Sequence, residues 1–553
     1  MNPSQEKSRI FLQRSQAIDA RIKSLEESVE ESVRVLKHER NALAPVSFLP
    51  PEVFTAIFSS VCLHGKPSLG GKLGHSIARI RLSHVCHQWR AIALNQSLLW
   101  SHIDFTTLSL AGAAEILARA KSVPLYLEVG NRWNDVLLRT IRKEIQACIP
   151  HICHLGISAE NVDQILSLLG ALASPAPALE YLSLFSTSKL SGVTLSLRNT
   201  LLDGSAPRLS CLKLRHCAIS WKWPPFKGLK YLEIHDPGGP ELRPNLAVWL
   251  GALAEMPELK TLTLSRASPV APPFPFDVKG TVTLPSLTYF NIKGTLEDCV
   301  LALAHLDLPA LTRLSLEAIC YSFPKSGDAQ GLLPYVARYA QPFQSTLVRN
   351  NGKCVDVLGL PVPDARYRRR GAQPAYLAWC DAPYTCLALS FRCKERSGSH
   401  VKLLDLLMMG LPLDGIVTLA AQDLRNRDTY HHHFPVKQFW LHTFPKFSQL
   451  RRVRLSPHIA GGFIEMLLED NEERERPLLP SLTESIVVDA SAYDLSSLPL
   501  IDALMKRVGF RWRWSTCVCA LATMTTEVMS LCDASVKLWS TCWVRRATRQ
   551  EKT

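Results

Sequence analysis

The sequence has no long apolar run and no segment of the secretory-signal type. Its N-terminus, Met1–Arg14, mixes acidic and basic residues with no apolar stretch behind them, whereas a secretory signal needs an apolar core. The most apolar long window, Leu403–Ala421, is interrupted by two aspartates and a proline. A membrane span needs about 20 nearly uncharged residues. We therefore expect neither export nor insertion into a membrane.

Short motifs of well-known catalytic chemistry are also missing. The sequence contains no Gly-rich phosphate loop, no Gly-x-Ser-x-Gly elbow and no His-Glu-x-x-His helix. These absences predict a protein without catalytic residues and without a cofactor.

Groups of cysteine and histidine that could bind a metal are sparse. They are Cys148 with His151, Cys153 and His154; Cys517 with Cys519; and His431–His433. In the first group, Ile152 and Leu155 take the core positions of a predicted strand, and neither cysteine group has a second ligand pair at zinc-finger spacing. The histidine run lies in a polar connection. We predict no metal site, and interpret these residues as ordinary thiols and solvated side chains.

The composition is that of a packed protein. The chain has 553 residues, of which 47% are hydrophobic and 20% charged, which leaves room for about two to four domains. Its 16 cysteines are scattered rather than gathered in a short framework, as expected where thiols stay reduced. A cytoplasmic or nuclear location, or both, is the expectation.

Basic residues exceed acidic ones, 63 to 49, for a formal charge of +14. The positive charge is spread thinly, and the one tight cluster is Arg366 with Arg368–Arg370, in a Pro- and Gly-containing stretch, Leu360–Pro374. A solvated basic loop is the simplest interpretation. An acidic partner or a nuclear-import patch are the alternatives.

Residues 8–43 predict one long helix with a coiled-coil pattern. Two seven-residue apolar series, offset by four, run along it: Phe11, Ile18 and Leu25, and Ile22, Val29, Leu36 and Leu43. The first series loses its apolar residue at Ser32 and Glu39. Self-association through residues 11–43 is therefore one expectation, and packing against the rest of the chain or a solvated helix are the others.

The segment after this helix predicts a short helical module. Pro45 ends the long helix, and Pro51 with Glu52 suits the first turn of the next one, where proline forfeits no hydrogen bond and the helix dipole favours a carboxylate. Apolar residues then recur at helical spacing at Val53, Phe54, Ile57, Phe58 and Val61. After a Gly-rich loop, Ser76 is expected to cap a second stretch. Its buried side is predicted to hold Ile80, Leu82, Val85, Cys86, Trp89, Ile92 and Ala93.

Several rare residues stand in a distinctive order in this segment. They are Leu49-Pro50-Pro51-Glu52, then Leu82-x-x-Val85-Cys86-x-x-Trp89-Arg90, and finally Leu98-Leu99-Trp100. Residues 47–101 thereby resemble the F-box, specifically its F-box-like variants. The inserted loop at residues 64–75 is longer than the link usual in that family and leaves the geometry between the helices open. A free-standing helical domain with Trp89 and Trp100 in its core is the other interpretation.

The chain beyond residue 102 contains a repeat with the template Pro-x-Leu-x-x-Leu-x-Leu. The first apolar positions of its copies are Ile152, Leu179, Leu209, Leu229, Leu259, Leu287 and Leu311. The intervals of 20 to 30 residues are typical of leucine-rich repeats. Each Leu-x-Leu pair predicts a short strand, and helical patterns lie between the strands.

We therefore predict an α/β fold, in which a small helical F-box-like module is followed by a right-handed βα leucine-rich-repeat solenoid, with a coiled-coil helix in front. The expected domains are the helix at 1–44, the module at 45–101, the solenoid at 102–510, and a cap with a basic tail at 511–553. The repeat lapses at about 321–383, which suggests a long insertion or irregular units.

The resemblance implies the substrate-receptor subunit of a Skp-cullin-F-box ubiquitin ligase. In that family the F-box binds the Skp adaptor, which links it to the cullin, and the other domain holds the target protein. By the resemblance, the adaptor-binding residues are Leu49, Pro50, Val53, Ile57, Leu82, Val85 and Cys86, braced by Trp89 and Trp100. Such a subunit is non-catalytic.

Target binding is expected on the face of the strands opposite the helices. Residues between and just after the core positions point there, namely Lys213, Arg215, Glu233, His235, Asn291, Lys293, Ser315 and Glu317. Their mixed polar character favours a protein or peptide, and simple solvation is the other interpretation. The target itself is not identifiable from the sequence.

Two other functions remain open. The chain could act as an adaptor-bound scaffold without ubiquitin transfer. It could also be a nucleic-acid-binding solenoid that uses the arginine cluster at 366–370, in which case its affinity should fall steeply with salt.

Overall fold

A computed structural model describes most of the chain up to residue 488. The described residues are 3–63, 73–105, 108–130, 135–159, 162–186, 195–197, 201–271, 280–320, 326–339, 343–350, 354–361, 385–393, 404, 407–423, 437–455, 463, 481–482 and 485–488. The chain divides into two compact units, Met1–Leu229 and Lys230–Thr553. The arginine cluster at 366–370, the histidines at 431–433 and the expected cap and tail at 511–553 lie outside the described residues.

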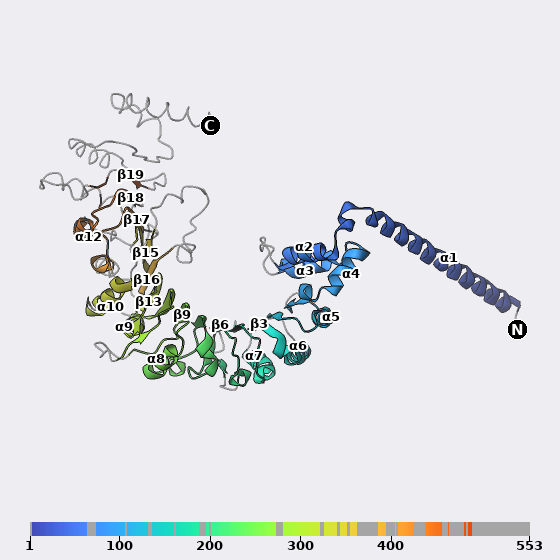
Figure 1. Cartoon of the computed structure of the whole chain (residues 1–553), viewed down its shortest axis with the longest axis horizontal. Coiled ribbons are helices and arrows are strands. Elements are labelled where there is room, and N and C mark those ends of the chain that lie inside the picture. The colour runs from blue at the N-terminus through green and yellow to red at the C-terminus, as the bar shows by residue number, and fades with distance from the viewer. Residues whose placement is uncertain are drawn as a thin grey trace, which may run out of the picture. The chain divides into compact units, whose positions relative to one another are not determined.

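Unit 1 begins with α1, a single helix of 40 residues, Pro3–Ala42 (Figure 1). The helix predicted over 8–43 is confirmed. From Arg9 to Ala42 its side chains are exposed, except for the half-buried Ser15 and Asn41. Among the described helices, none is long and apolar enough to cross a membrane.

A module of short helices follows: η1 (Pro45–Phe48), α2 (Pro51–Leu63), α3 (Leu73–Leu82), α4 (His87–Asn95) and η2 (Ser97–Trp100). Helix α2 begins at Pro51 as predicted. The single stretch expected after Ser76 is wrong, because a turn separates α3 from α4. Cys86 is the N-cap of α4, and its sulfur accepts a hydrogen bond from the Trp89 backbone N–H at 3.5 Å.

The rest of unit 1 is a parallel sheet whose strands follow chain order. The strands are β1 (His102–Asp104), β2 (Leu125–Val129), β3 (Ile152–Ala159), β4 (Tyr181–Ser186) and β6 (Cys211–Arg215), with a small pair β5 (Leu195–Leu197) and β7 (Cys217–Ile219) beside them. Helices α5 (Leu110–Ala120), α6 (Asp135–Cys148) and α7 (Val162–Leu169) connect the first four strands. Burial alternates along β4, so Leu182 and Leu184 face the core and Tyr181, Ser183 and Phe185 face the other side.

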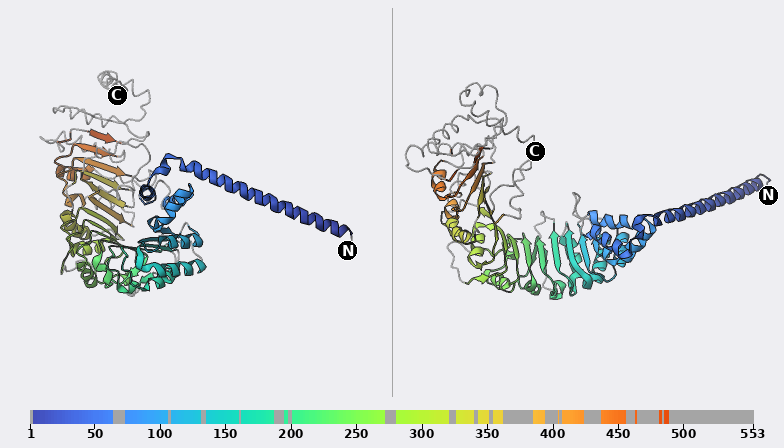
Figure 2. Two further views of the ribbon diagram at one scale, coloured as in Figure 1. Left: turned by 45° about the vertical axis from the view of Figure 1, so that its right-hand side comes forward. Right: turned by 45° about the horizontal axis from the view of Figure 1, so that its top comes forward.

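Unit 2 also contains parallel strands joined by helices. Parallel strands β8 (Tyr231–His235), β9 (Thr261–Ser265), β11 (Tyr289–Thr295) and β13 (Arg313–Cys320) pair in chain order (Figure 2). Helices α8 (Leu246–Ala254) and α9 (Leu296–Ala304) connect them, with the short pair β10 (Val282–Thr283) and β12 (Leu306–Asp307). Every one of the predicted Leu-x-Leu pairs between Leu155 and Leu316 falls within a strand.

The described part of the segment at 321–383, where the repeat lapses, forms a helix and an antiparallel pair of strands. It holds α10 (Ser326–Tyr339) and the strands β14 (Ser345–Asn350) and β15 (Cys354–Leu360), which pair antiparallel. This hairpin stands between β16 (Leu387–Cys393) and β17 (Thr418–Asp423), so the strands no longer follow chain order. Helix α12 (Lys437–Thr443) and the parallel strands β18 (Arg452–Leu455) and β19 (Ser485–Val488) come after it.

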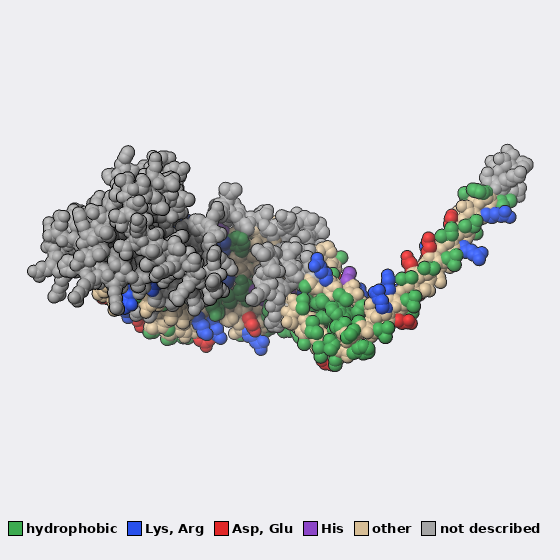
Figure 3. Space-filling model, turned by 90° about the horizontal axis from the view of Figure 1, so that it is seen from above, with side chains coloured by type: hydrophobic (Ala, Val, Ile, Leu, Met, Phe, Trp, Pro, Cys, Tyr) green, Lys and Arg blue, Asp and Glu red, His purple; other side chains and the backbone are tan. Residues whose placement is uncertain are grey.

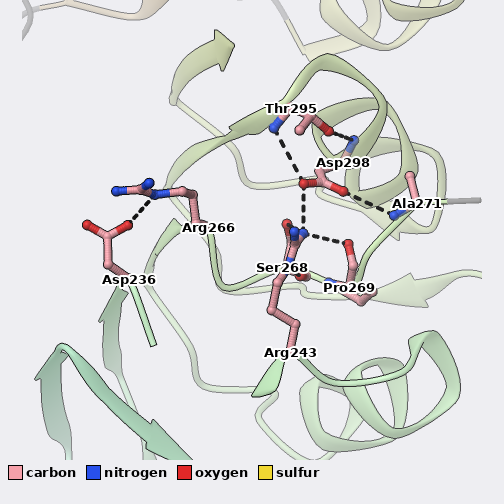
Figure 4. Close-up of polar contacts among 8 residues, drawn as sticks. All are labelled: Asp236, Arg243, Arg266, Ser268, Pro269, Ala271, Thr295 and Asp298. Atoms are coloured by element: carbon pink, nitrogen blue, oxygen red, sulfur yellow. Dashed lines mark hydrogen bonds and ion pairs between the residues drawn. The ribbon is translucent and has the colours of Figure 1, made fainter. Parts of the chain in front are cut away.

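A buried ion pair links three segments of unit 2 that connect its strands (Figure 4). The Arg243 guanidinium lies 2.7 Å from the Asp298 carboxylate, and the two side chains are only 9% and 4% exposed. Arg243 also donates to the Ser268 and Pro269 carbonyls, at 2.6 and 2.9 Å. Asp298 accepts from the backbone N–H of Ala271 at 3.0 Å. The pair therefore joins α9 to the segment before α8, and the hydrogen bonds of both residues hold the loop after β9.

A second pair in the same view differs mainly in its exposure. Arg266 donates to Asp236 at 2.5 Å, and its side chain is 57% exposed. Both residues have positive φ, 52° and 48°, at the residue that directly follows a strand. Because water screens this pair, it is expected to contribute little to stability.

The two pairs give a matched test. Replacing Arg243 by Ala leaves a buried carboxylate without its cation, which should cost unit 2 about 3–5 kcal/mol of unfolding free energy. Replacing Arg266 by Ala should cost under about 1 kcal/mol. Hydrogen exchange of the β9 and β11 amides measures both effects in the full chain. If both variants lost the same unfolding free energy, burial of the Arg243–Asp298 pair would not contribute to the stability of unit 2.

Candidate functional site

The first candidate site is built on α2 and the residues that lead into it. The Pro50 carbonyl accepts the first backbone hydrogen bonds of α2, from Val53 at 3.0 Å and Phe54 at 3.3 Å. Proline at Pro51 loses no bond in this first turn, and Glu52 lies at the positive end of the helix dipole. The Leu49-Pro50 pair thus marks the N-terminal end of α2.

One face of α2 forms the core of the module. Phe54, Phe58 and Cys62, spaced four residues apart, are 0%, 0% and 4% exposed. The Trp89 ring from α4 lies 5.6 Å from the Phe54 ring and 5.2 Å from the Phe58 ring. These tilted and edge-on contacts are favourable for aromatic rings. They fix how α2 is rotated about its axis.

The neighbouring face of α2 is apolar as well, and it is uncovered. Val53, Ile57 and Val61 precede the three core residues by one position each, and they are 40%, 41% and 48% exposed. Val85, in the turn before α4, is 55% exposed. Figure 3 shows hydrophobic side chains gathered on this module, next to the C-terminal end of α1. We call Val53, Ile57, Val61 and Val85 the α2 patch.

The residues predicted to bind the adaptor fall into three groups by exposure: exposed, half-buried and buried. Val53, Ile57 and Val85 belong to the α2 patch, and Pro50 is exposed at the end of α2. Half-buried positions are taken by Leu49, Leu82, Cys86 and Trp89, whereas Trp100 is 1% exposed. Trp100 therefore belongs to the core, as its expected bracing role requires.

Trp100 and Arg79 are buried and donate hydrogen bonds to backbone carbonyl groups of the module. The Trp100 indole N–H donates to the Ala93 carbonyl at 2.8 Å, and the Arg119 guanidinium lies 4.8 Å from the Trp100 ring. Arg79, 2% exposed, donates to the Leu99 carbonyl at 3.2 Å. Burial lowers the pKa of Arg79 to about 10, partly offset by Cys62 and Asp104. Both side chains thus satisfy carbonyl groups at the end of the helical segment.

The sequence analysis assigned no site role to Val61, which is exposed beside Ile57, or to Arg79, which is buried in the module. Val61 lies one helical turn beyond Ile57, so its spacing could have added it to the adaptor-facing set. Arg79 carried no signal, because an arginine in an amphipathic helix is exposed in most proteins.

The second candidate site is the polar face of the sheet in unit 2. Two rows of paired residues cross β8, β9, β11 and β13: Glu233, Thr263, Asn291 and Ser315, and His235, Ser265, Lys293 and Glu317. All six residues predicted there for target binding are half-buried and stand in these rows. The structure therefore brings these six together.

Most charges in this second site pair with each other. The Lys293 ammonium lies 2.8 Å from the Glu317 carboxylate, which also faces Arg392 at 3.1 Å. The His235 ring lies 2.7 Å from the Glu233 carboxylate. The face thus offers a target polar atoms rather than a strong field of one sign.

The other two predicted residues, Lys213 and Arg215, lie in unit 1 on β6. Lys213 is 5.9 Å from the Tyr181 ring and Arg215 is 5.1 Å from the Phe185 ring, which are cation–π distances. Tyr181 stacks on His154 at 3.9 Å, and His154 lies 3.1 Å from Glu128. His154 therefore contacts side chains on both neighbouring strands.

Metal and thiol chemistry finds no support in the described part of the chain. There, no group of three or more His, Cys, Asp or Glu side chains could hold a metal ion. Burial raises the pKa of Cys62, and it raises that of Cys217 to about 12. A thiol with a raised pKa stays protonated and is a weak nucleophile.

Substitutions at adjacent positions on the two faces of α2 should have very different effects on the stability of the module. Phe58→Ala should destabilise the module by about 3–5 kcal/mol, because it opens a cavity against Trp89. Ile57→Ala should change its stability by no more than about 0.5 kcal/mol. Hydrogen exchange of the α2 and α4 amides reports both values. A large loss for Ile57→Ala would mean that the α2 patch is part of the core.

The comparisons with known proteins bear on this module. Residues 46–106 match the family model described as F-box-like. No curated protein matches the chain. The matched range begins within η1 and extends just beyond β1, so it contains the α2 patch and its aromatic core. The chain therefore contains an F-box-like domain at residues 46–106.

Proposed function

We propose that the chain is the substrate-receptor subunit of a Skp-cullin-F-box type ubiquitin ligase. In this proposal the F-box-like domain binds the Skp adaptor, and the sheet-rich region holds the protein to be ubiquitylated. The observation that carries it is the uncovered α2 patch within the matched domain. F-box-like domains are commonly Skp-binding modules.

The chemistry of the α2 patch suits a protein partner. Its four side chains are aliphatic, and three of them recur every four residues along one helix, so they form a ridge that an apolar groove can accept. Contiguous apolar surface is costly in water unless something covers it. Because Phe54 and Phe58 fill the core, covering the patch requires no rearrangement of α2.

A receptor of this kind performs no bond chemistry. It holds a target near the transfer machinery and so raises the effective concentration of the reacting groups. The raised pKa values of the buried thiols agree with such a role. We therefore propose a non-catalytic subunit, without cofactor or metal.

For the target, we propose the polar face of a leucine-rich-repeat-like solenoid. The parallel pairing in chain order and the helical connections support this architecture. Lys293 forms an ion pair with Glu317, and the His235 ring lies 2.7 Å from the Glu233 carboxylate, so these side chains contact each other within the face. Target recognition should then depend on hydrogen bonds and shape, with a weaker dependence on salt than binding to a charged patch would show.

The adaptor interface has a direct test. Ile57→Asp should weaken binding of the full chain to purified Skp adaptor by at least about tenfold, because an unpaired carboxylate would be buried in an apolar contact. Isothermal titration calorimetry measures the affinity. Leu49→Ala with Pro50→Ala should also weaken binding while the sheet-rich region stays folded.

Leu166→Asp is the matched control. Leu166 is an aliphatic residue on α7 with 48% exposure, close to the value for Ile57, but it lies outside the matched domain. This variant should bind the adaptor as the unchanged chain does. Equal adaptor affinity of the Ile57 and Leu166 variants would refute the proposed interface. Cullin recovered together with the adaptor would argue against the scaffold function.

A further inference from the structure

Helix α1 carries an apolar seam that the described structure leaves uncovered. The central residues of the seam are Ile18, Ile22, Leu25 and Val29, with exposed fractions of 59%, 48%, 60% and 61%. At 1.5 Å per residue, the seam from Phe11 to Leu43 is about 50 Å long. A surface helix normally buries such a stripe.

We propose that α1 pairs with α1 of a second copy of this chain as a parallel, in-register, two-stranded coiled coil. In heptad terms, Ile22, Val29 and Leu36 take a positions, and Ile18 and Leu25 take d positions. Branched residues such as isoleucine and valine at a, with leucine at d, favour two strands over three or four. Ile22 and Val29 at a, with Leu25 at d, follow this rule, whereas Ser15 at a and Ile18 at d do not.

Charges beside the seam show why the occupant is another copy. In a parallel pair, a g residue faces the e residue five positions later on the other helix. Arg14 and Arg21 are g residues, and Asp19 and Glu26 are the e residues that lie five positions after them. Each arginine would therefore meet an acidic residue of the second copy, and symmetry repeats both pairs. The helix is thus complementary to itself.

The same charges favour the parallel orientation. In an antiparallel pair g residues face g residues, and the charged g residues of the seam, Arg14 and Arg21, are both basic. These arginines would then find no acidic g partner. The parallel, in-register arrangement keeps all of the g–e attractions.

The C-terminal half of the seam is less apolar than the N-terminal half. Ser32 and Glu39 occupy d positions there, so the apolar series is interrupted. Val33 and Val35 at the flanking e and g positions are 42% and 47% exposed and widen the apolar surface on both sides. The strongest pairing is therefore expected between residues 11 and 29.

The test uses the full chain in sedimentation velocity. The unchanged protein should sediment as a species of twice 61.7 kDa. Ile22→Lys with Val29→Lys should abolish this dimer, since lysine keeps helix propensity but cannot be buried in the seam. Gln13→Lys with Ala20→Lys, both at f positions that face away from the seam, should leave the dimer intact. A monomeric unchanged chain, or a dimer that survives the seam variant, would overturn the proposal.

Charge exchange tests the self-complementary pairs. Arg14→Glu with Arg21→Glu makes both flanks acidic, and Asp19→Arg with Glu26→Arg makes both flanks basic. Each variant alone should lose the dimer, and an equimolar mixture should regain it as a heterodimer. Dimers of each variant alone, or no association in the mixture, would contradict the pairing.

Disulfide cross-linking tests the orientation. Ser15 is an a residue, so two copies of Ser15→Cys should cross-link under oxidation in a parallel, in-register pair. Ala20→Cys, at an f position, should add no cross-link beyond that of the unchanged chain. Absence of the Ser15→Cys cross-link in a dimeric protein would exclude the parallel register. The Ile57→Asp variant should still dimerise, so failure of adaptor binding and failure of dimerisation are separate results.

Discussion

The contact of Phe54 and Phe58 with Trp89 is the interaction on which the module depends. Because α2 has apolar residues on two adjacent faces, either face could in principle be buried. The aromatic rings, at 5.2 and 5.6 Å from Trp89, fill the core, and the smaller aliphatic face is thereby turned outward. A rotation of α2 by one residue would exchange the two faces, at the cost of this aromatic core. The exposed patch is thus a consequence of core packing.

In the sheet-rich region, the corresponding constraint is the alternation of buried and outward residues along strands such as β11 and β13. It places Asn291 and Ser315 beside each other on the outward face, and likewise Lys293 and Glu317. Opposite charges on neighbouring strands, such as those of Lys293 and Glu317, then form ion pairs within the sheet rather than with a partner protein. A face of this kind is stable on its own, and it leaves selectivity to groups such as Asn291 whose bonding capacity is not taken up by a charge.

Local patterns in the sequence predicted the strands and the start of α2 because each depends on a few adjacent residues. Leu314-x-Leu316 needs only the two-residue period of a strand, and Pro51-Glu52 only the chemistry of a helix start. The turn before α4 was missed because a cysteine sulfur, at Cys86, caps the helix where a serine or aspartate would have been recognised.

The hairpin β14–β15 could not be predicted for a different reason. All seven residues of β15, Cys354–Leu360, are buried, so the strand shows no alternation between apolar and polar positions. Its position between β16 and β17 is set by pairing between segments far apart in the sequence. Asp356 is 3% exposed there and lies beside Arg349 and Ser390, a burial that no local pattern signals.

The two uncovered apolar surfaces of unit 1 differ in what they can bind. The seam of α1 has arginines and carboxylates at matching offsets, so a second α1 satisfies it. The α2 patch is aliphatic without such a charge pattern, so it calls for a groove on a different protein. The end of α1 is tied to the module, since the His38 ring lies 5.6 Å from the His87 ring and Ser47 donates to the Asn41 carbonyl at 2.7 Å. Pairing of α1 would therefore join two F-box-like domains, and, under the proposed receptor function, two linked copies would hold a multivalent target longer than one does.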